Sequence, residues 1–535
     1  MSYEEWLARR LRARSRDLRN RPNGAEFSVL TTVYDTPTEF LREAASSIFR
    51  QTEHSFEWIV LDNGSRRADV VAALEEIARD ARVRYLRVDE NLGIMGGMCR
   101  CLETAQHEYV IPVDSDDVLL PDALALLSYA LSENPTAAFV YTDEDVLRDG
   151  RAGSPYLRPD WDPVLNICTS YVFHLCAFRR DDALRLGVYS DDAATWCHDW
   201  DTIHRFVADG AEVVHVPEVA YHWRSHERST THRADPERGS LESQHHLLTR
   251  MIAARERPEL FEVQLFPANR GAPELWVRRR RERPDPLDVV LVASNRETAE
   301  LSLDRLNATA NYPFRSVRVV DVGGPHAIGH AVTDRDGLTL IYTDAVSPEG
   351  DEWPWEAQGL AELHPDAVLF SGRVLNRDRI VVAGGEILGF DGLIGVPDRG
   401  RSENDPGYWA LSLKQRSVSA CNSAFFLARP DFLRTTLASL PLEATLDFLG
   451  AWLGAAARVA KKRVVFSPLI TALAPGIFTG RQKPAPGEAE VFSARYGHFI
   501  PDTRWYSPHF CREAGHAYEL AVPRRTQRIT RFVGR

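Results

Sequence analysis

Three carboxylates follow the apolar run YVIPV within four positions, at Asp114, Asp116 and Asp117. Acidic groups beside a buried segment cost free energy unless they are paired or bound to a metal. In extended backbone Asp114 and Asp116 point to the same side, where they repel each other unless a cation lies between them. Mg²⁺ and similar hard divalent ions prefer oxygen ligands and often share them with phosphate. The pattern predicts a platform for a metal-bound diphosphate. Capping of the next helix, the alternative, explains only one of the three acids.

Two further acids stand where strands are predicted to end. Asp62 follows the apolar run FEWIVL, and its carboxylate is suited to accept a ring N–H or a ribose hydroxyl. The alternative is an Asp-Asn-Gly turn that needs no ligand, and Asp62 alone favours that turn. Asp35, which precedes Thr-Pro-Thr, has the same two interpretations. Together with the acid cluster at Asp114, the ligand-binding interpretation is favoured for both.

The segment TWCHDWDTIHRFVADG (195–210) predicts a short amphipathic helix. At about 100° per residue Asp199 lies on its apolar, inward face, and Asp201 lies opposite, in solvent. An inward acid near other carboxylates holds a proton more tightly, which suits a general base. Stabilisation of the helix N-terminus by Asp199 is an equally good interpretation of this segment alone.

The segment YHWRSHERSTTHR (221–233) places His222, Arg224 and His226 at every second position. In an extended loop these side chains converge on one side. Histidine can complete a metal shell, and arginine neutralises phosphate with a fork of donors. A surface loop with scattered histidines is the alternative, which the regular alternation makes less favoured.

These residues are positioned by an alternation of strands and helices over about the first 90 residues after position 26. The predicted strands are 27–34, 56–62, 83–88 and 109–113, with a helix between each pair. Such an alternation predicts a mostly parallel sheet flanked by helices, which binds ligands beyond the carboxyl ends of its strands. Asp35, Asp62 and Asp114 therefore meet at one rim.

The chain also repeats itself. Residues 287–324 echo the opening block, with Asp321 in the place of Asp62, and IYTDAVSP echoes PVDSDDVL, with Asp344 in the place of Asp114. The fold class expected is α/β, with two tandem domains of one design joined near the charged, proline-punctuated segment 278–286. The predicted parts are a basic N-terminal helix (1–26), a catalytic domain (27–284), a degenerate domain (285–475) and a C-terminal extension (476–535).

Composition narrows the class of protein. The chain has 535 residues, 44% of them hydrophobic, and a net charge of −12. Neither a signal peptide nor a membrane-spanning run is recognisable, and seven irregularly spaced cysteines indicate reduced thiols, so a cytoplasmic protein is expected. The acidic body argues against a nucleic-acid partner. Both ends of the chain are basic. One interpretation is contact with an anionic membrane, at the inner face of the plasma membrane. The other, a solvated amphipathic helix and a frayed tail, is favoured.

The ordered segments TTVYDTP, VLDNGS, ENLGI, VDSDD, HDWD and YHWRSH resemble a family 2 glycosyltransferase with the GT-A fold. YTDED and RPDW resemble its subgroup that makes bacterial surface polysaccharides such as O-antigen. The resemblance implies an inverting, metal-dependent hexosyl- or deoxyhexosyl-transferase. It would use Mg²⁺ or Mn²⁺ and a UDP or dTDP sugar, and transfer to a hydroxyl of a glycan or lipid-linked glycan.

The resemblance also assigns roles to the residues above. It implies that Asp35 and Asp62 hold the nucleoside, and that Asp199 is the base that deprotonates the acceptor. The remaining set would hold the diphosphate and the metal. The implied ligands of the diphosphate are Asp114, Arg224 and His226. The implied ligands of the metal are Asp114, Asp116 and His222. One departure from the family is that Met98 and Cys99 stand where relatives carry an Arg-Asn pair; Arg100 is the nearest basic residue.

The second copy lacks much of this set. Val346 stands in the place of Asp116, and TALA replaces YHWR, although Asp447 stands where Asp199 does. We therefore expect a catalytically silent copy that serves acceptor binding, packing or self-association. Two other functions are compatible with parts of the chain: a non-catalytic sugar-nucleotide-binding scaffold, and a haloacid-dehalogenase-like phosphatase in which Asp114 attacks phosphorus. The phosphatase is disfavoured because its motif normally opens the domain.

Overall fold

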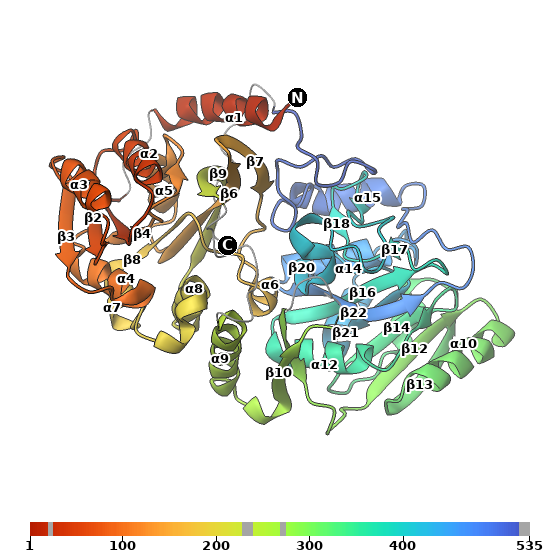
Figure 1. The fold of residues 1–535 in the computed structure, drawn as a ribbon. Coiled ribbons are helices and arrows are strands. Elements are labelled where there is room, and N and C mark those ends of the chain that lie inside the picture. The colour runs from red at the N-terminus through yellow and green to blue at the C-terminus, as the bar shows by residue number, and fades with distance from the viewer. Residues whose placement is uncertain (20–24, 227–238, 268–273, 524–535) are drawn as a thin grey trace.

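The computed structural model describes residues 1–19, 25–226, 239–267 and 274–523. The chain forms two α/β units side by side, with helix α1 lying over the first unit and its N-terminal end near the second in the view of Figure 1. Within the described residues no helix is both long and apolar enough to cross a bilayer.

The first unit is built on a nine-stranded sheet in the order β3-β2-β1-β4-β8-β6-β9-β5, with β7 paired to β6. β1, β2, β3 and β4 are mutually parallel, β8 is inserted antiparallel, and β9 runs parallel to β6. The strands are β1 (Phe27–Val33), β2 (Phe56–Asn63), β3 (Val83–Val88), β4 (Tyr109–Pro112), β5 (Val118–Leu119), β6 (Phe139–Arg148), β7 (Arg151–Tyr156), β8 (Cys176–Arg179) and β9 (Val213–Arg224).

Helices cover both faces of this sheet, which explains why β2 is buried along its whole length. One face packs against α2 (Thr38–Phe49), α3 (Ala68–Ile77) and α5 (Ala123–Glu133). The other packs against α4 (Gly93–Thr104), α6 (Pro163–Cys168), α7 (Arg180–Arg185), α8 (His198–Ala208) and α9 (Ser240–Ala253). α2 shows the cause: Leu41, Ala44, Ala45 and Ile48 recur at helical spacing and are all buried.

The second unit repeats the design. Its sheet runs β13-β12-β14-β21-β16-β22-β15, with β17 paired to β16 and β20 to β22. This strand order is the same as that of the first unit, except that β3 has no counterpart. The equivalent strands are β12 and β1, β13 and β2, β14 and β4, β15 and β5, β16 and β6, β17 and β7, β21 and β8, and β22 and β9. The strands are β12 (Leu287–Ala293), β13 (Phe314–Asp321), β14 (Thr339–Thr343), β15 (Ser347–Pro348), β16 (Ala367–Leu375), β17 (Val381–Ala383), β20 (Arg416–Val418), β21 (Phe425–Ala428) and β22 (Arg463–Leu473).

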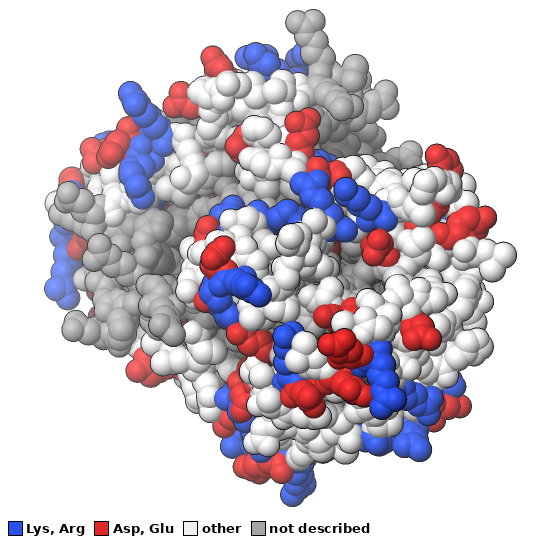
Figure 2. Space-filling view, turned by 90° about the vertical axis from the view of Figure 1, so that its right-hand side faces the viewer, with Lys and Arg blue, Asp and Glu red and all other residues white. Residues whose placement is uncertain are grey.

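Helices again cover both faces of the second sheet. α10 (Arg296–Thr309) and α12 (Trp353–Leu363) lie on one face. The other face carries α11 (Pro325–Ala331), α13 (Pro430–Ala438), α14 (Leu449–Val459) and α15 (Glu488–Tyr496). The predicted fold class, two tandem α/β domains with flanking helices, is confirmed. Figure 2 shows one face of the molecule, with acidic and basic side chains interspersed over its lower half.

The predicted linker 278–286 does not begin as a solvated segment. Its first two arginines belong to β11 (Leu275–Arg279), which pairs antiparallel with β10 (Phe261–Leu265). Arg279 is buried and forms ion pairs with Glu362 and Asp285. A run of four arginines resembles a charged linker, but an arginine is readily buried where carboxylates neutralise it.

The basic N-terminal helix is α1 (Tyr3–Leu18), and the favoured expectation of a solvated helix is wrong for its inner face. Arg10 and Arg14 are buried there, paired with Glu218 and Asp122, the latter at 2.7 Å. The indole N–H of Trp6 donates to the carbonyl of Ala521, 3.0 Å away. α1 therefore joins the first unit to the C-terminal segment, as its position in Figure 1 shows. The basic tail predicted at the other end lies mostly outside the described residues.

Candidate active site

The carboxyl ends of β1, β2 and β4 lie at one edge of the first sheet, because the strands are parallel and in register. Val33 is opposite Asp62 across β1 and β2, and Val113 donates its N–H to Leu30 in β1. Asp62 is therefore the next-to-last residue of its strand, and Asp35 and Asp114 each follow a strand by two residues.

Asp62 and Asp35 are both held by the loop that follows β2. Asp62 is fully buried, accepts the N–H of Ser65 at 2.8 Å and pairs with Arg87 of β3 at 2.9 Å. Asp35 has a left-handed backbone (φ 51°) and accepts two backbone N–H groups, from Arg66 and Arg67, each at 2.9 Å. Both acids shape the rim, so the turn interpretation describes part of their role.

The acid cluster after β4 divides into exposed and buried members. The Asp114 side chain is 62% exposed and that of Asp116 30%. Asp117 is buried, accepting the hydroxyl of Tyr221 and the backbone N–H of Arg224, each at 2.6 Å. Asp117 thus ties the acid loop to β9.

His174 completes this cluster from the segment before β8. Its Nε2 lies 3.6 Å from Asp114, its Nδ1 lies 3.3 Å from Glu144, and its ring stacks on Tyr221 with centroids 4.8 Å apart. One ligand atom each of Asp114, Asp117 and His174 lies within 4.8 Å of the others. Two carboxylates and an imidazole form a donor set that fits a divalent cation.

The electrostatics of the cluster also favour a cation. Desolvation and then the charge of Asp114 raise the pKa of Asp116, and the same two causes raise the pKa of Asp117 well above its usual range. Desolvation opposes ionisation of Asp114, but the neighbouring imidazole of His174 outweighs this and holds the pKa of Asp114 below its usual value. Burial opposes the charged form of His174, whereas Asp114 and Glu144 raise its pKa well above the usual range. His174 must release its proton to ligate a metal.

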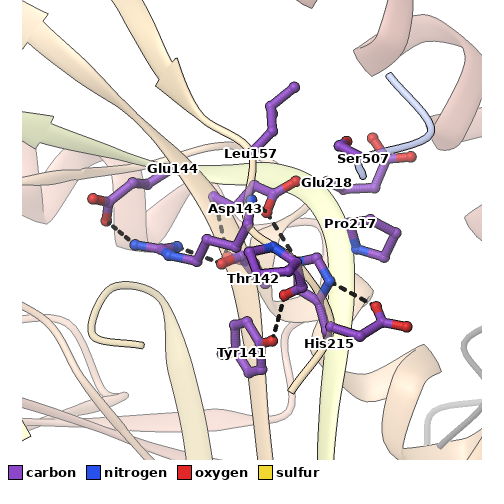
Figure 3. Close-up of polar contacts among 12 residues, drawn as sticks. Tyr141, Thr142, Asp143, Glu144, Leu157, His215, Pro217, Glu218 and Ser507 are labelled. Atoms are coloured by element: carbon purple, nitrogen blue, oxygen red, sulfur yellow. Dashed lines mark hydrogen bonds and ion pairs between the residues drawn. The ribbon is translucent and has the colours of Figure 1, made fainter. Parts of the chain in front are cut away.

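Behind His174 lies a buried network formed by the YTDED and RPDW segments (Figure 3). Arg158 is ion-paired with Glu144 at 3.0 Å and donates to the carbonyl of His174 at 2.7 Å. Its backbone N–H donates to Asp143, which also contacts His215 at 2.9 Å. The network fixes the strand β6 against the segment that carries His174.

The histidine and arginine alternation lies along the end of β9. His222 contacts Asp145 at 2.5 Å, and His226 contacts Asp116 at 3.1 Å. Arg224 is nearly buried and donates to the backbone carbonyl of Asp116 at 2.6 Å. The structure therefore places His226 and Arg224 against the acid loop, but it places His222 against Asp145 in β6. Residues 227–233 of the predicted segment lie outside the described residues.

In α8 the expected environments of two acids are partly reversed. Asp201, expected in solvent, is buried and paired with Arg205 at 2.7 Å and with Arg250. A helical wheel reads the acid as solvated because it does not include Arg250, which reaches Asp201 from α9. Asp199 is 37% exposed, 3.4 Å from His198. His198 contributes to the low pKa of Asp114, so the first turn of α8 is near the acid cluster.

Met98 and Cys99 lie in α4, where Met98 is buried in the core. Arg100 is exposed and faces Glu103 at 3.6 Å. The structure gives Arg100 a surface ion pair and does not bring it to the acid rim.

Sequence reasoning missed His174, Glu144 and Arg158. A signal was available for His174: it precedes β8, and a strand antiparallel to β4 begins at the rim where β4 ends. Reading CAFR as a returning strand would have placed it there.

The sheet order and acid rim define an α/β unit of the GT-A type. Residues 28–185 match the family model described as Glycosyl transferase family 2. The predicted resemblance is confirmed by this match.

Parts of several known proteins are similar to this chain. The chain is 29% identical over 201 residues to O-antigen biosynthesis protein RfbC of Myxococcus xanthus, covering 37% of this chain and 16% of RfbC. It is 23% identical over 183 residues to the UDP-Gal:alpha-D-GlcNAc-diphosphoundecaprenol beta-1,3-galactosyltransferase of Escherichia coli, covering 32% of this chain and 66% of that protein. The match thus spans about a sixth of RfbC. A structure of S. aureus TarS residues 1–349 superposes with a TM-score of 0.35 at 18% identity, covering 43% of this chain and 66% of that one.

Proposed function

We propose that the chain is an inverting glycosyltransferase that moves a sugar from a nucleotide-diphosphate donor to a hydroxyl of a glycan or lipid-linked glycan. The observation that carries the proposal is the exposed Asp114 in an acid cluster at the strand ends of a family 2 domain. In this proposal the acceptor belongs to bacterial surface polysaccharide synthesis, supported by the name of RfbC. The scaffold and phosphatase alternatives receive no support from the family match.

The proposed donor site uses the rim acids in sequence. Asp62 and Asp35 contact the nucleoside, and the loop 114–117 faces the diphosphate. A divalent ion, Mg²⁺ or Mn²⁺, when bound there would stabilise the departing diphosphate. Asp114 and Asp116, the two accessible acids, are the proposed ligands, with His222 or His174 completing the set. Arg224 and His226 act on the diphosphate partly by fixing the backbone and carboxylate of Asp116.

Asp199 is the proposed base. Its carboxylate takes the proton of the acceptor hydroxyl as that oxygen attacks the anomeric carbon, and the bond from that carbon to the diphosphate oxygen breaks on the opposite face. The nucleoside diphosphate leaves, and the configuration is inverted. A partly exposed carboxylate beside the acid cluster is accessible to an acceptor, which a fully buried acid such as Asp201 is not.

Asp199→Asn tests this role. We expect turnover to fall by about 10²–10⁴-fold, the usual contribution of a general base, while donor binding measured by calorimetry is kept. Asp192→Asn, an exposed acid in the preceding 3-10 helix η1 (Asp192–Cys197), is the matched control and keeps full turnover. Undiminished turnover in Asp199→Asn would reject Asp199 as the base.

The donor and the metal are tested by melting temperature. A ligand that binds only the native state raises it, so a panel of UDP and dTDP sugars is measured with and without Mn²⁺. UDP-Gal comes first, because the E. coli relative is named for it. A stabilisation that needs both Mn²⁺ and the nucleotide sugar is expected, and its absence across the panel would contradict the proposed donor site.

We place the protein in the cytoplasm, in peripheral contact with an anionic membrane. Support comes from its cysteines, all unpaired, and from the outer face of α1, where four exposed arginines recur at helical spacing: Arg9, Arg12, Arg16 and Arg19. Co-sedimentation with phosphatidylglycerol vesicles, but not with phosphatidylcholine vesicles, is expected and should fall in the triple variant Arg9→Gln, Arg12→Gln, Arg16→Gln. Equal sedimentation with both lipids would reject this contact.

A further inference from the structure

A groove of about 970 Å³ lies where the two units meet. On the first unit it is lined by the β6–β7 hairpin, including Arg148, Arg151 and Ser154. On the second unit it is lined by Gly407, Tyr408 and Trp409 at the start of the 3-10 helix η4 (Tyr408–Leu413). None of these residues has a role in the proposed donor site.

The aromatic wall of the groove is fixed from behind by the first unit. The ring of Trp409 stacks on Tyr156 with centroids 4.4 Å apart, and its indole N–H donates to the carbonyl of Pro155 at 3.2 Å. The hydroxyl of Tyr408 donates to the same carbonyl at 2.6 Å and accepts the N–H of Leu157 at 2.8 Å. Trp409 nevertheless remains 36% exposed. A tryptophan held in place but open to a groove offers a flat apolar surface.

The backbone that presents Trp409 is unusual. Trp409 (φ 47°) and Ala410 (φ 62°) are both left-handed, and both carry a Cβ that disfavours this region. Strained backbone of this kind persists where the surroundings hold it, and it clusters at ligand sites. Here the hydrogen bonds of Tyr408 and Trp409 to the first unit do the holding.

The other wall is basic. Arg148 and Arg151 are opposite each other in the β6–β7 register, and both are exposed. Arg148 lies 3.4 Å from the hydroxyl of Ser225, and among the described residues Asp149 is the one acid that lines the groove with them. Two guanidinium groups against one carboxylate leave a net positive charge that suits a phosphate or carboxylate group.

The groove begins close to the acid cluster. β6 carries Asp145, which contacts His222, and Arg148 follows three residues later, about 10 Å along the strand. His222 in turn pairs with Val118, the residue after Asp117. A chain molecule with one end at the donor site can therefore extend into the groove.

We propose that this groove binds the acceptor, an oligosaccharide chain that carries anionic groups, with Trp409 of the second unit stacking on a sugar ring and Arg148 and Arg151 contacting the anion. This inference rests on the proposed function and adds the substrate class and the contribution of the second unit. It also explains what the second unit supplies to the reaction: one wall of the acceptor site.

The test uses the full chain and measures direct binding of three probes by calorimetry: a phosphorylated core oligosaccharide released from lipopolysaccharide, the same oligosaccharide after phosphatase treatment, and an oligogalacturonide. The wild type should bind an anionic probe more tightly than the dephosphorylated one. Preference for the phosphorylated probe or for the oligogalacturonide identifies the anion as phosphate or carboxylate. Trp409→Ala should weaken binding about tenfold, and Trp409→Phe should retain most of it. Arg148→Gln with Arg151→Gln should abolish the preference for the charged probe.

Donor binding and hydrolysis of the donor by water are measured on the same variants and should be unchanged. Arg296→Gln, at an arginine 91% exposed on α10, is the control for lost surface charge. Equal binding of all three probes by the wild type, no binding of any of the three, or unaltered binding in the groove variants would overturn the inference. Absence of donor binding in the wild type would instead overturn the proposed function.

Discussion

The two units share a sheet order but use the same acid differently. Asp114 follows β4 and remains 62% exposed beside His174. Asp344 follows β14 at the equivalent place, but it accepts the backbone N–H of Ser294 and the hydroxyl of Thr298, each at 2.7 Å. In the second unit this carboxylate fastens the start of α10 to the strand end. The same residue type at the same position therefore indicates a site only when its neighbours leave it open.

Strand register shows how completely the neighbours have changed. The pairing of β4 with β8 and of β14 with β21 makes Ser423 the counterpart of His174. The pairing of β5 with β9 and of β15 with β22 gives the counterparts of the residues in the acid loop and at the end of β9. Asp116, Asp117, His222 and Arg224 are replaced by Val346, Ser347, Ala472 and Ala474. β16 carries no acid where β6 carries Asp143, Glu144 and Asp145. Packing alone is enough to maintain the sheet, whereas the chemistry needs side chains that packing does not require.

The units also differ at the sheet edge. In the first unit β3 covers β2, and its Arg87 neutralises the buried Asp62. In the second unit β13 is itself the edge strand, and Asp321 is exposed. Val317 and Val319 of β13 are 44% and 48% exposed as a result. Loss of β3 removes one wall of the proposed nucleoside site, which supports a silent second copy.

The largest expected effect separates Asp114 from Asp344. Asp114→Asn should lower the rate of sugar transfer by more than about 100-fold. Even mutation of a residue that only contacts a metal ligand lowers metal affinity or activity by about 10–100-fold. Asp344→Asn should leave transfer unchanged, because that carboxylate is committed to Ser294 and Thr298. Initial rates with Mn²⁺ and a nucleotide sugar measure both. A matching loss in Asp344→Asn would show that the second unit has a working site.

A buried acid of the second unit should make its stability depend on pH. Desolvation raises the pKa of Glu356 to about 7, although Ser467 and Gln415 donate to it. Since the native state holds this proton more tightly than the unfolded chain, the free energy of unfolding falls as pH rises from about 4.5 to about 7, by about 3 kcal/mol. Its counterpart Leu126 in the first unit has no such effect.

Glu356→Gln tests this difference. Denaturant unfolding at pH 5 and pH 8 should show a smaller fall in the variant than in the wild type, because only the contribution of Glu356 is removed. In the first unit burial disfavours charged His215, but Asp143 and Asp160 outweigh that and raise its pKa to about 9. The stability it contributes is therefore present below about 6.5 and lost as pH rises through 9. A wild type whose stability did not change between pH 5 and 7 would contradict the assignment to Glu356.

A smaller effect is expected at the sheet edge. Arg87→Ala leaves Asp62 buried without its charged partner and should lower the free energy of unfolding measurably. Asp321→Asn at the exposed equivalent in the second unit should change it by less than about 0.5 kcal/mol. Urea unfolding measures both. Equal effects would mean that the missing β3 matters little for the environment of this acid.

The sequence predicted what repeats along strands and helices. Asp35, Asp62 and Asp114 could be placed at one rim because apolar runs mark parallel strands, and the second unit could be recognised from Asp321 and Asp344. Contacts made by chain segments far apart were not readable. His174 returns to the rim through antiparallel β8, and Asp201 is buried where Arg250 reaches it from α9. For the same reason the buried arginines of α1 were expected in solvent.

The smallest effect concerns how Asp344 is held. Asn295 caps α10 by accepting the N–H of Thr298 at 3.0 Å, while Asp344 accepts the hydroxyl of the same residue. Asn295→Ala should cost about 1 kcal/mol. Because both side chains hold Thr298, the loss in the double variant with Asp344→Asn should differ from the sum of the single losses by at least about 0.5 kcal/mol. Additive losses would show that Asp344 is not engaged with the helix and is available for a ligand, as Asp114 is.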